Sequence, residues 1–388
     1  MNQMTSVPPT QPPQPVIFSG DRGDFLRLVM RGAVLELVTA GFYRFWLATD
    51  MRRHLWSNSS VAGEAAEYTG RARELLVGFL VALAILAPVY LAYFLAGLAA
   101  EEITAFASVP LVLFFYLFGQ FAIYRARRYR LTRTVWRGVR LWMTGSGWAY
   151  AAQAALWGLL VVLTLGLILP WRDAALERYK MRHSHYGDLQ GSFEARGGEL
   201  FKRAWWIWLL AVVSLVIPLL LPVLAVLTAI AAPFLYAAFR AVQWRWWLSG
   251  IRFGGVRLES DLRTGALFGV YWRAIGWIVL LLGVFALYLA GCVGVLLLIS
   301  GLPQEQFLTP QRLSNDIPLL VLTGFGYLGL VLAMNVVIRI CLLRDQWCQV
   351  VQSISVHGLD AAADVAAKGD LANALGEGFA DGLDVGGL

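Results

Sequence analysis

Long apolar segments recur along this chain and constrain its fold more than any other feature. Runs such as 75–98 and 267–300 exceed the roughly 18 residues that a helix needs to cross a bilayer core of about 30 Å. Only 15% of the 388 residues are charged, against about 25% in soluble domains. The runs are apolar on every face, which excludes the alternating strands of a transmembrane β-barrel. The sequence therefore predicts a polytopic α-helical membrane protein.

The apolar runs predict about six to eight membrane segments. The expected segments are 25–48, 75–98, 105–125, 148–171, 205–239, 267–300 and 318–341. The run 205–239 is too long for one ordinary helix and is interrupted by Pro218, Pro222 and Pro233. It predicts either a tight helical hairpin around Pro218–Pro222 or one long kinked helix.

Basic, aromatic and glycine-containing modules separate the apolar runs, at 52–76, 127–150, 178–201 and 245–268. Arginine beside an apolar span is typical of the cytoplasmic side, so we expect these modules and the N-terminus in the cytoplasm. Each module contains a short strand-like stretch and a glycine turn before a new helix, and 16–26 is a further copy of this part. Isolated strands this short are unstable, so we expect the copies to pair into a small cytoplasmic sheet.

Two of the apolar segments need not cross the membrane fully. Segment 25–48 carries Glu36 and several arginines, so we expect a tilted or interfacial helix in which Glu36 pairs with an arginine four or five positions earlier. Segment 148–171 looks like one crossing, whereas modules on one side need an even number of crossings. Either it is a re-entrant hairpin broken near 164–166, or one module lies outside. The stretches 39–56 and 164–181 are alike, with threonine, glycine, tryptophan and arginine in register.

The composition also divides the chain into three parts. Residues 1–15 are rich in proline and predict a disordered tail. Residues 16–356 form the expected multi-pass membrane domain with its repeated basic modules. Residues 357–388 are an acidic tail rich in alanine and glycine, either solvated or partly helical and docked on the basic modules.

Several scattered motifs resemble one known family. They are F-S-G-D-x-G-D-F at 18–25, V-T-x-G-x-Y-x-F-W at 38–46, Y-T-G-x-x-x-E-L at 68–75, R-T-x-W-R-G at 133–138, T-L-G-x-x-x-P-W at 164–171 and G-E-G-F-A-D-x-x-D-V-G at 376–386. In this order they resemble the YjgN-like bacterial inner-membrane proteins, a domain-of-unknown-function family. The resemblance covers nearly the whole chain. It implies a multi-pass protein of the bacterial inner membrane, and it implies neither an activity nor any catalytic or binding residue.

Two sets of residues are candidates for function. Polar residues inside apolar runs are candidates for an intramembrane polar path, and these are Gln120, Gln153 and Asn335. Hydrogen bonding between helices is the alternative explanation for them. The densest basic cluster is a candidate for contacts with anionic lipid headgroups, and it consists of Arg125, Arg127, Arg128, Arg130 and Arg133.

No motif in the sequence predicts catalysis. Nucleophile motifs and phosphate-binding loops are missing, so we expect no enzyme, no cofactor and no catalytic or metal site. The net charge of +7 comes from arginines beside apolar runs, which indicates membrane lipids rather than nucleic acid as the partner. Two hypotheses remain. The protein transports or handles lipid or another substrate, or it is a membrane scaffold that binds anionic lipid or a protein partner through its basic cytoplasmic face.

Overall fold

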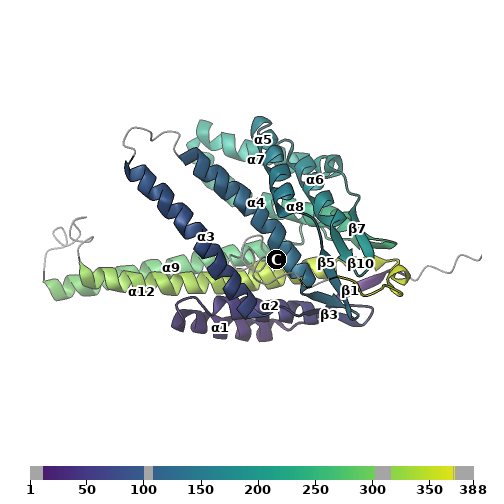
Figure 1. Ribbon diagram of the computed structural model, residues 1–388. Helices are drawn as coiled ribbons and strands as arrows, with labels where there is room; N and C mark the ends of the chain where they lie inside the picture. The colour runs from purple at the N-terminus through teal and green to yellow at the C-terminus, as the bar shows by residue number, and fades with distance from the viewer. Residues whose placement is uncertain (1–11, 100–107, 302–315, 370, 372–388) are drawn as a thin grey trace, which may run out of the picture.

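The fold, seen in a computed structural model, joins a ring of helices to a closed β-barrel (Figure 1). The structure describes residues 12–99, 108–301, 316–369 and 371. The barrel has ten short strands. Figure 1 shows that the strands gather at one end of the molecule and that the long helices extend away from them. The fold class is therefore the expected helical one, and the expected sheet is present as a complete barrel.

Every strand of the barrel is antiparallel to its two neighbours, in the order β1-β10-β9-β8-β7-β6-β5-β4-β3-β2. Four hairpins come from the four basic modules. Their strands are β2 (Ser59–Val61) with β3 (Glu64–Tyr68), β4 (Thr134–Trp136) with β5 (Val139–Met143), β6 (Ser184–Tyr186) with β7 (Leu189–Phe193), and β8 (Ile251–Phe253) with β9 (Val256–Ser260). The two remaining strands, β1 (Gln14–Phe18) and β10 (Ile354–His357), pair with each other and complete the ring.

One backbone hydrogen bond recurs between neighbouring strand pairs. The residue after the second strand of one pair donates its N–H to the carbonyl oxygen of the residue before the first strand of the next pair, at 2.8–3.1 Å. The five donor–acceptor pairs are Ser19–Asn58, Thr69–Arg133, Thr144–His183, Glu194–Gly250 and Asp261–Ser353. The pair made by β10 and β1 therefore occupies the place of a fifth hairpin, although its strands come from opposite ends of the sequence.

Each strand of the barrel is joined to a helix, and the helices follow one another around the ring. They are α1 (Arg22–Val38), α2 (Arg44–Ser57), α3 (Ala72–Ala99), α4 (Ser108–Thr132), α5 (Gly147–Leu163), α6 (Leu169–Arg182), α7 (Gly197–Leu220), α8 (Ala225–Gly250), α9 (Phe268–Ser300) and α12 (Ile317–Val337), which continues into a π-helix, η2 (Ile338–Asp345), and α13 (Gln346–Gln352). Neighbouring helices pack together, and α12 packs against α1. The ring of helices is therefore closed like the barrel.

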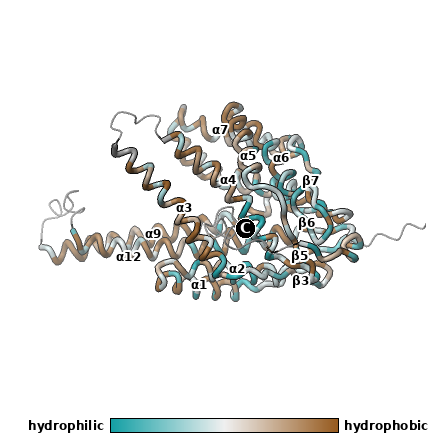
Figure 2. Tube along the Cα trace, viewed as in Figure 1, coloured by the Kyte–Doolittle hydropathy of each residue, from teal (hydrophilic) through white to brown (hydrophobic). Residues whose placement is uncertain are grey.

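Six of these helical segments are long and apolar enough to cross a membrane: 72–95, 109–132, 197–219, 222–250, 268–300 and 317–352. Figure 2 shows α3, α9 and α12 as mostly hydrophobic. The run 205–239 is a helical hairpin, because α7 ends at Leu220 and a short 3₁₀ turn, η1 (Pro222–Leu224), precedes α8. Of the two interpretations of this run, the hairpin is confirmed.

The segments 25–48 and 148–171 each contain a reversal of the chain. Helix α1 ends at Val38 and α5 at Leu163, and each is followed by a turn with a left-handed glycine, Gly41 (φ 87°) or Gly166 (φ 86°). The helices α2 and α6 then return to the barrel. Segment 148–171 is thus the hairpin broken near 164–166, and no single crossing separates β5 from β6. All four modules can therefore lie on one side of the membrane, because every strand lies at the same end of the helices.

The ends of the barrel domain differ slightly from the expected boundaries. Strand β1 begins at Gln14, inside the segment expected to be a disordered tail. After β10, a short 3₁₀ helix, η3 (Leu359–Ala362), packs against β9, and the backbone N–H of Ala366 donates to Asp188. The start of the acidic tail is therefore docked on the barrel, while 372–388 lies outside the described residues.

Candidate functional site

Charged side chains of α4 and α6 meet in the helical ring near the barrel. Glu177 of α6 accepts a hydrogen bond from Arg127 of α4 at 3.1 Å and also pairs with Lys180, one helical turn further along α6. All three side chains are less than one-fifth exposed. Burial alone would raise the pKa of Glu177, but the two cations outweigh it and lower that pKa to about 2. Glu177 is therefore a buried anion that compensates two buried cations.

A second polar group links α6 to α8 on the same side of the ring. Asp173 accepts a hydrogen bond from the amide of Gln243 at 3.4 Å, and the Gln243 side-chain oxygen accepts one from Arg240 at 2.6 Å. The guanidinium of Arg172 lies 4.0 Å from the other oxygen of Asp173. Burial raises the pKa of Asp173. We call these four residues, Arg172, Asp173, Arg240 and Gln243, the α6–α8 polar group.

An apolar groove ends at this polar group. It has a volume of about 670 Å³ and lies between α7, α8 and the turn that joins α5 to α6. The helices α7 and α8 supply most of its wall, including Ala204, Ala211, Ala229 and Phe239. Among the described residues of this lining, Asp173 is the one acidic or basic side chain. The helices α5 and α6 are shorter than α7 and α8, so the turn between α5 and α6 lies partway along α7 and α8. Residues of this turn line the groove on the side of α6.

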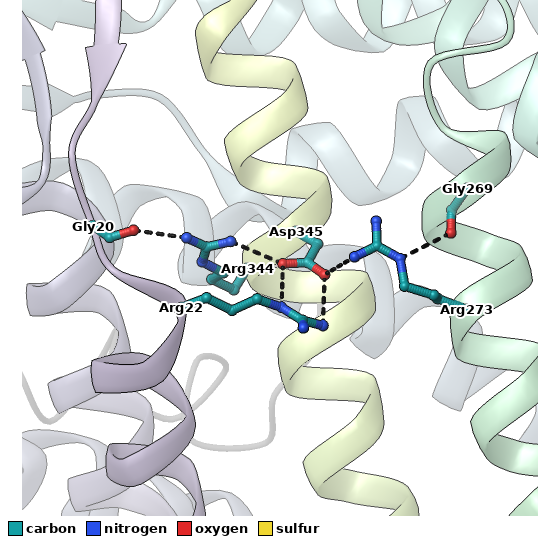
Figure 3. A network of polar contacts seen from close by, with 6 residues as sticks. All are labelled: Gly20, Arg22, Gly269, Arg273, Arg344 and Asp345. Atoms are coloured by element: carbon teal, nitrogen blue, oxygen red, sulfur yellow. Dashed lines mark hydrogen bonds and ion pairs between the residues drawn. The ribbon is translucent and has the colours of Figure 1, made fainter.

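A third polar group, centred on Asp345, ties the two ends of the chain together (Figure 3). The buried Asp345 carboxylate accepts hydrogen bonds from Arg22 of α1 at 3.1 and 3.3 Å, from Arg344 at 3.0 Å and from Arg273 of α9 at 3.4 Å. Arg344 also donates to the carbonyl oxygen of Gly20, which follows β1. Gly20 and Arg22 follow β1, and Asp345 lies at the end of η2, from which α13 leads to β10, so this group links the segments next to the strand pair that closes the barrel.

The pairing expected for Glu36 is wrong. Glu36 accepts two hydrogen bonds, at 2.8 and 3.1 Å, from Arg339 of η2, which is 303 positions away in the sequence. Both side chains are largely buried, with 9% of Glu36 and 17% of Arg339 exposed. The π-helix brings Arg339 against α1, and a two-bond carboxylate–guanidinium pair is stronger than an exposed pair along one helix.

The three residues predicted to form a polar path lie on α4, α5 and α12. Gln120, Gln153 and Asn335 are all half-buried. The side chain of Asn335 donates to the carbonyl oxygen of Val331 in its own helix at 2.9 Å. None of the three lines the apolar groove or the small polar pocket formed by β3 and β4. A path through these residues stays a prediction.

The predicted headgroup cluster is partly engaged in contacts within the protein. Arg127 pairs with Glu177, and the buried Arg133 donates to Glu74 of α3 at 2.9 Å. Arg125 lies over the ring of Phe121 at 5.5 Å. Arg128 and Arg130 are half-buried on α4. Lipid contacts of these five arginines stay a prediction, and two of them already form ion pairs with carboxylates of the protein.

The α6–α8 polar group was not among the sequence candidates, although part of its signal is visible there. Arg240 and Gln243 follow an apolar stretch directly, and Asp173 interrupts the basic end of 164–181. The sequence alone does not say that α6 and α8 are neighbours. Among the described residues, no group of three or more histidine, cysteine, aspartate or glutamate side chains could hold a metal ion.

A ring of helices with six candidate membrane spans, joined to a closed ten-stranded barrel, is the class that this fold defines. Residues 13–229, more than half of the chain, match a family described as bacterial protein of unknown function (DUF898), and the chain belongs to this family. No curated protein and no solved structure matches the chain.

Proposed function

We propose that this protein handles lipid in the bacterial inner membrane and binds an acyl chain in the groove between α7 and α8. The observation that carries this proposal is an apolar groove that lies between two candidate membrane spans and reaches the half-buried α6–α8 polar group at Asp173. Its volume of about 670 Å³ falls in the range of about 300–1,000 Å³ that small-molecule sites occupy.

The residues around the groove favour an acyl chain as its ligand. In a membrane, the exposed side chains of α7 and α8 face lipid, and several of them also line the groove, such as Trp205, Trp208 and Leu215. Each methylene group that leaves water contributes about 0.8 kcal/mol, so an acyl chain gains from occupying an apolar wall of this length. The expected partner is thus membrane lipid rather than nucleic acid, and the expected activity is binding rather than catalysis.

The proposed orientation places the barrel in the cytoplasm. All strands lie at one end of the helices, and the basic modules that form them belong on the cytoplasmic side by their arginine content. The recurring hydrogen bond between strand pairs supports an origin of the barrel from five copies of one repeated unit. Kinship with the YjgN-like proteins is part of the same proposal, on the motifs of the sequence.

A membrane scaffold is the second candidate function. The buried ion pairs and the closed ring would suit a rigid platform for lipid or protein partners. A scaffold does not require an apolar groove between spans, so we favour lipid handling. The two candidates differ in what they predict when the groove is filled.

A substitution in the groove tests the proposal. Ala229→Trp places a large ring in the groove wall, whereas Val226→Trp, on the same helix, changes a residue that is 70% exposed and outside the lining. Native mass spectrometry of the detergent-purified protein measures the lipid retained. We expect bound lipid in the wild type and in Val226→Trp and its loss in Ala229→Trp. Equal lipid retention by both variants would refute the groove as the binding site.

A further inference from the structure

We infer that the lipid of this groove is an anionic phospholipid whose phosphate group lies against Arg172 and Arg240. This inference rests on the proposed function and adds the class of headgroup. It starts from the position of the α6–α8 polar group at the end of the groove. Asp173 lines the groove, as do Pro170, two positions before Arg172, and Phe239, directly before Arg240, whereas the two arginines lie behind this lining.

The net charge of the α6–α8 polar group favours the binding of an anion. It contains two guanidinium groups and one carboxylate, and Gln243 joins Asp173 to Arg240 without adding charge. The group therefore carries an excess positive charge of one. Glu177 does not compensate this excess, because it is paired with Arg127 and Lys180.

Within the described part of the chain, Arg172 and Arg240 each also have a hydrogen-bond donor without an acceptor. Among the described residues, the buried Nε–H groups of Arg172 and Arg240 have no hydrogen-bond partner. A buried donor without an acceptor destabilises the protein, and more so when the donor is charged. Guanidinium groups bind phosphate oxygens with paired, charge-assisted hydrogen bonds. A phosphodiester at the end of the groove would supply both the missing acceptors and the missing negative charge.

A lipid amine bound to Asp173 is the opposite assignment for the same site. It would select a zwitterionic lipid such as phosphatidylethanolamine. The amide of Gln243 and the guanidinium of Arg172 already lie against the two carboxylate oxygens of Asp173. A further cation would meet two arginines close by, so the charge count opposes this assignment.

The test compares lipids that share their acyl chains and differ in headgroup. The full-length protein is exchanged into nanodiscs with equal amounts of phosphatidylglycerol, phosphatidylethanolamine and phosphatidylcholine, and the retained lipid is identified by mass spectrometry. We expect phosphatidylglycerol to be enriched about fivefold or more, since one basic residue at a headgroup contributes about that factor. The double variant Arg172→Gln, Arg240→Gln should keep lipid but lose this preference.

Three further measurements separate the interpretations. Arg263→Gln changes an exposed arginine after β9 and should keep the preference, and Arg172→Lys with Arg240→Lys should keep part of it if the double glutamine variant fails to fold. Excess glycerol 3-phosphate, which lacks acyl chains, should not displace the lipid. Retention without headgroup preference, enrichment of phosphatidylethanolamine, or displacement by glycerol 3-phosphate would overturn the inference. A wild type that retains no lipid would instead overturn the proposed function.

Discussion

At the scale of single residues, buried carboxylates determine which helices can meet. Glu36, Glu177 and Asp345 each accept hydrogen bonds from an arginine on another helix. Removing one partner of a buried ion pair leaves the other charge without compensation and costs about 3–5 kcal/mol. The sequence shows that these residues interrupt apolar or basic stretches, but the partner of Glu36 could not be predicted, since Arg339 is distant in sequence.

The substitution Glu177→Gln tests the buried charge network. It should lower the free energy of unfolding by about 3–5 kcal/mol, because Arg127 and Lys180 lose their anion. Thermal unfolding in detergent measures the change, and Glu199→Gln, at an exposed position of α7, should stay within about 0.5 kcal/mol of the wild type. Equal unfolding temperatures for the two variants would contradict the network.

The pH dependence of stability follows from the same residue. The pKa of Glu177 is about 2 in the folded protein and 4.5 as an ordinary glutamate. A lowered folded-state pKa gives stability that is complete above the unfolded value and is lost as the pH falls from 4.5 towards 2. We expect the unfolding temperature of the wild type to drop across this range more than that of Glu177→Gln. Parallel pH profiles for the two proteins would speak against a lowered pKa.

At the scale of elements, the two short helical hairpins distinguish this fold from a simple series of spans. Hydropathy alone reads 148–171 as one crossing, because the turn at 164–168 is as apolar as α5 and the charged residues of α6 begin only at Arg172. The likeness of 39–56 and 164–181 was the useful signal. It places a threonine at the end of each first helix, where its hydroxyl donates to a carbonyl oxygen four residues earlier, and a left-handed glycine two residues later.

A glycine-to-alanine substitution changes the stability in opposite directions in a left-handed turn and in a continuous helix, so it tests the turn after α5. Gly166 has a φ of 86°, so Gly166→Ala should destabilise the protein by about 1 kcal/mol. In a continuous helix the same change would stabilise it by about that amount. Gly276→Ala, in the middle of α9 with open space around its Cα, serves as the helical control and should be neutral or stabilising. Stabilisation by Gly166→Ala in a chemical-denaturation measurement would rule out the turn.

At the scale of the whole molecule, the sequence predicts the spans and the strand-forming modules but not the closed barrel. Strands of three to five residues carry too little pattern to define their partners, and β10 has no basic module around it. Closure depends on β1 and β10 meeting from opposite ends of the chain, supported by the polar group around Asp345. The groove depends in turn on α7 and α8 being held beside the shorter α5–α6 hairpin.

In the proposed orientation all strands lie on one side of the membrane, and cysteine labelling in intact cells tests this most directly. Single cysteines replace Glu67 in β3 and Ser192 in β7, both exposed, and Val223 at the far end of the α7–α8 hairpin, in a chain without Cys292, Cys341 and Cys348. A membrane-impermeant maleimide should label position 223 in intact cells and positions 67 and 192 only after the membrane is opened. Labelling of position 67 or 192 from outside would contradict the account.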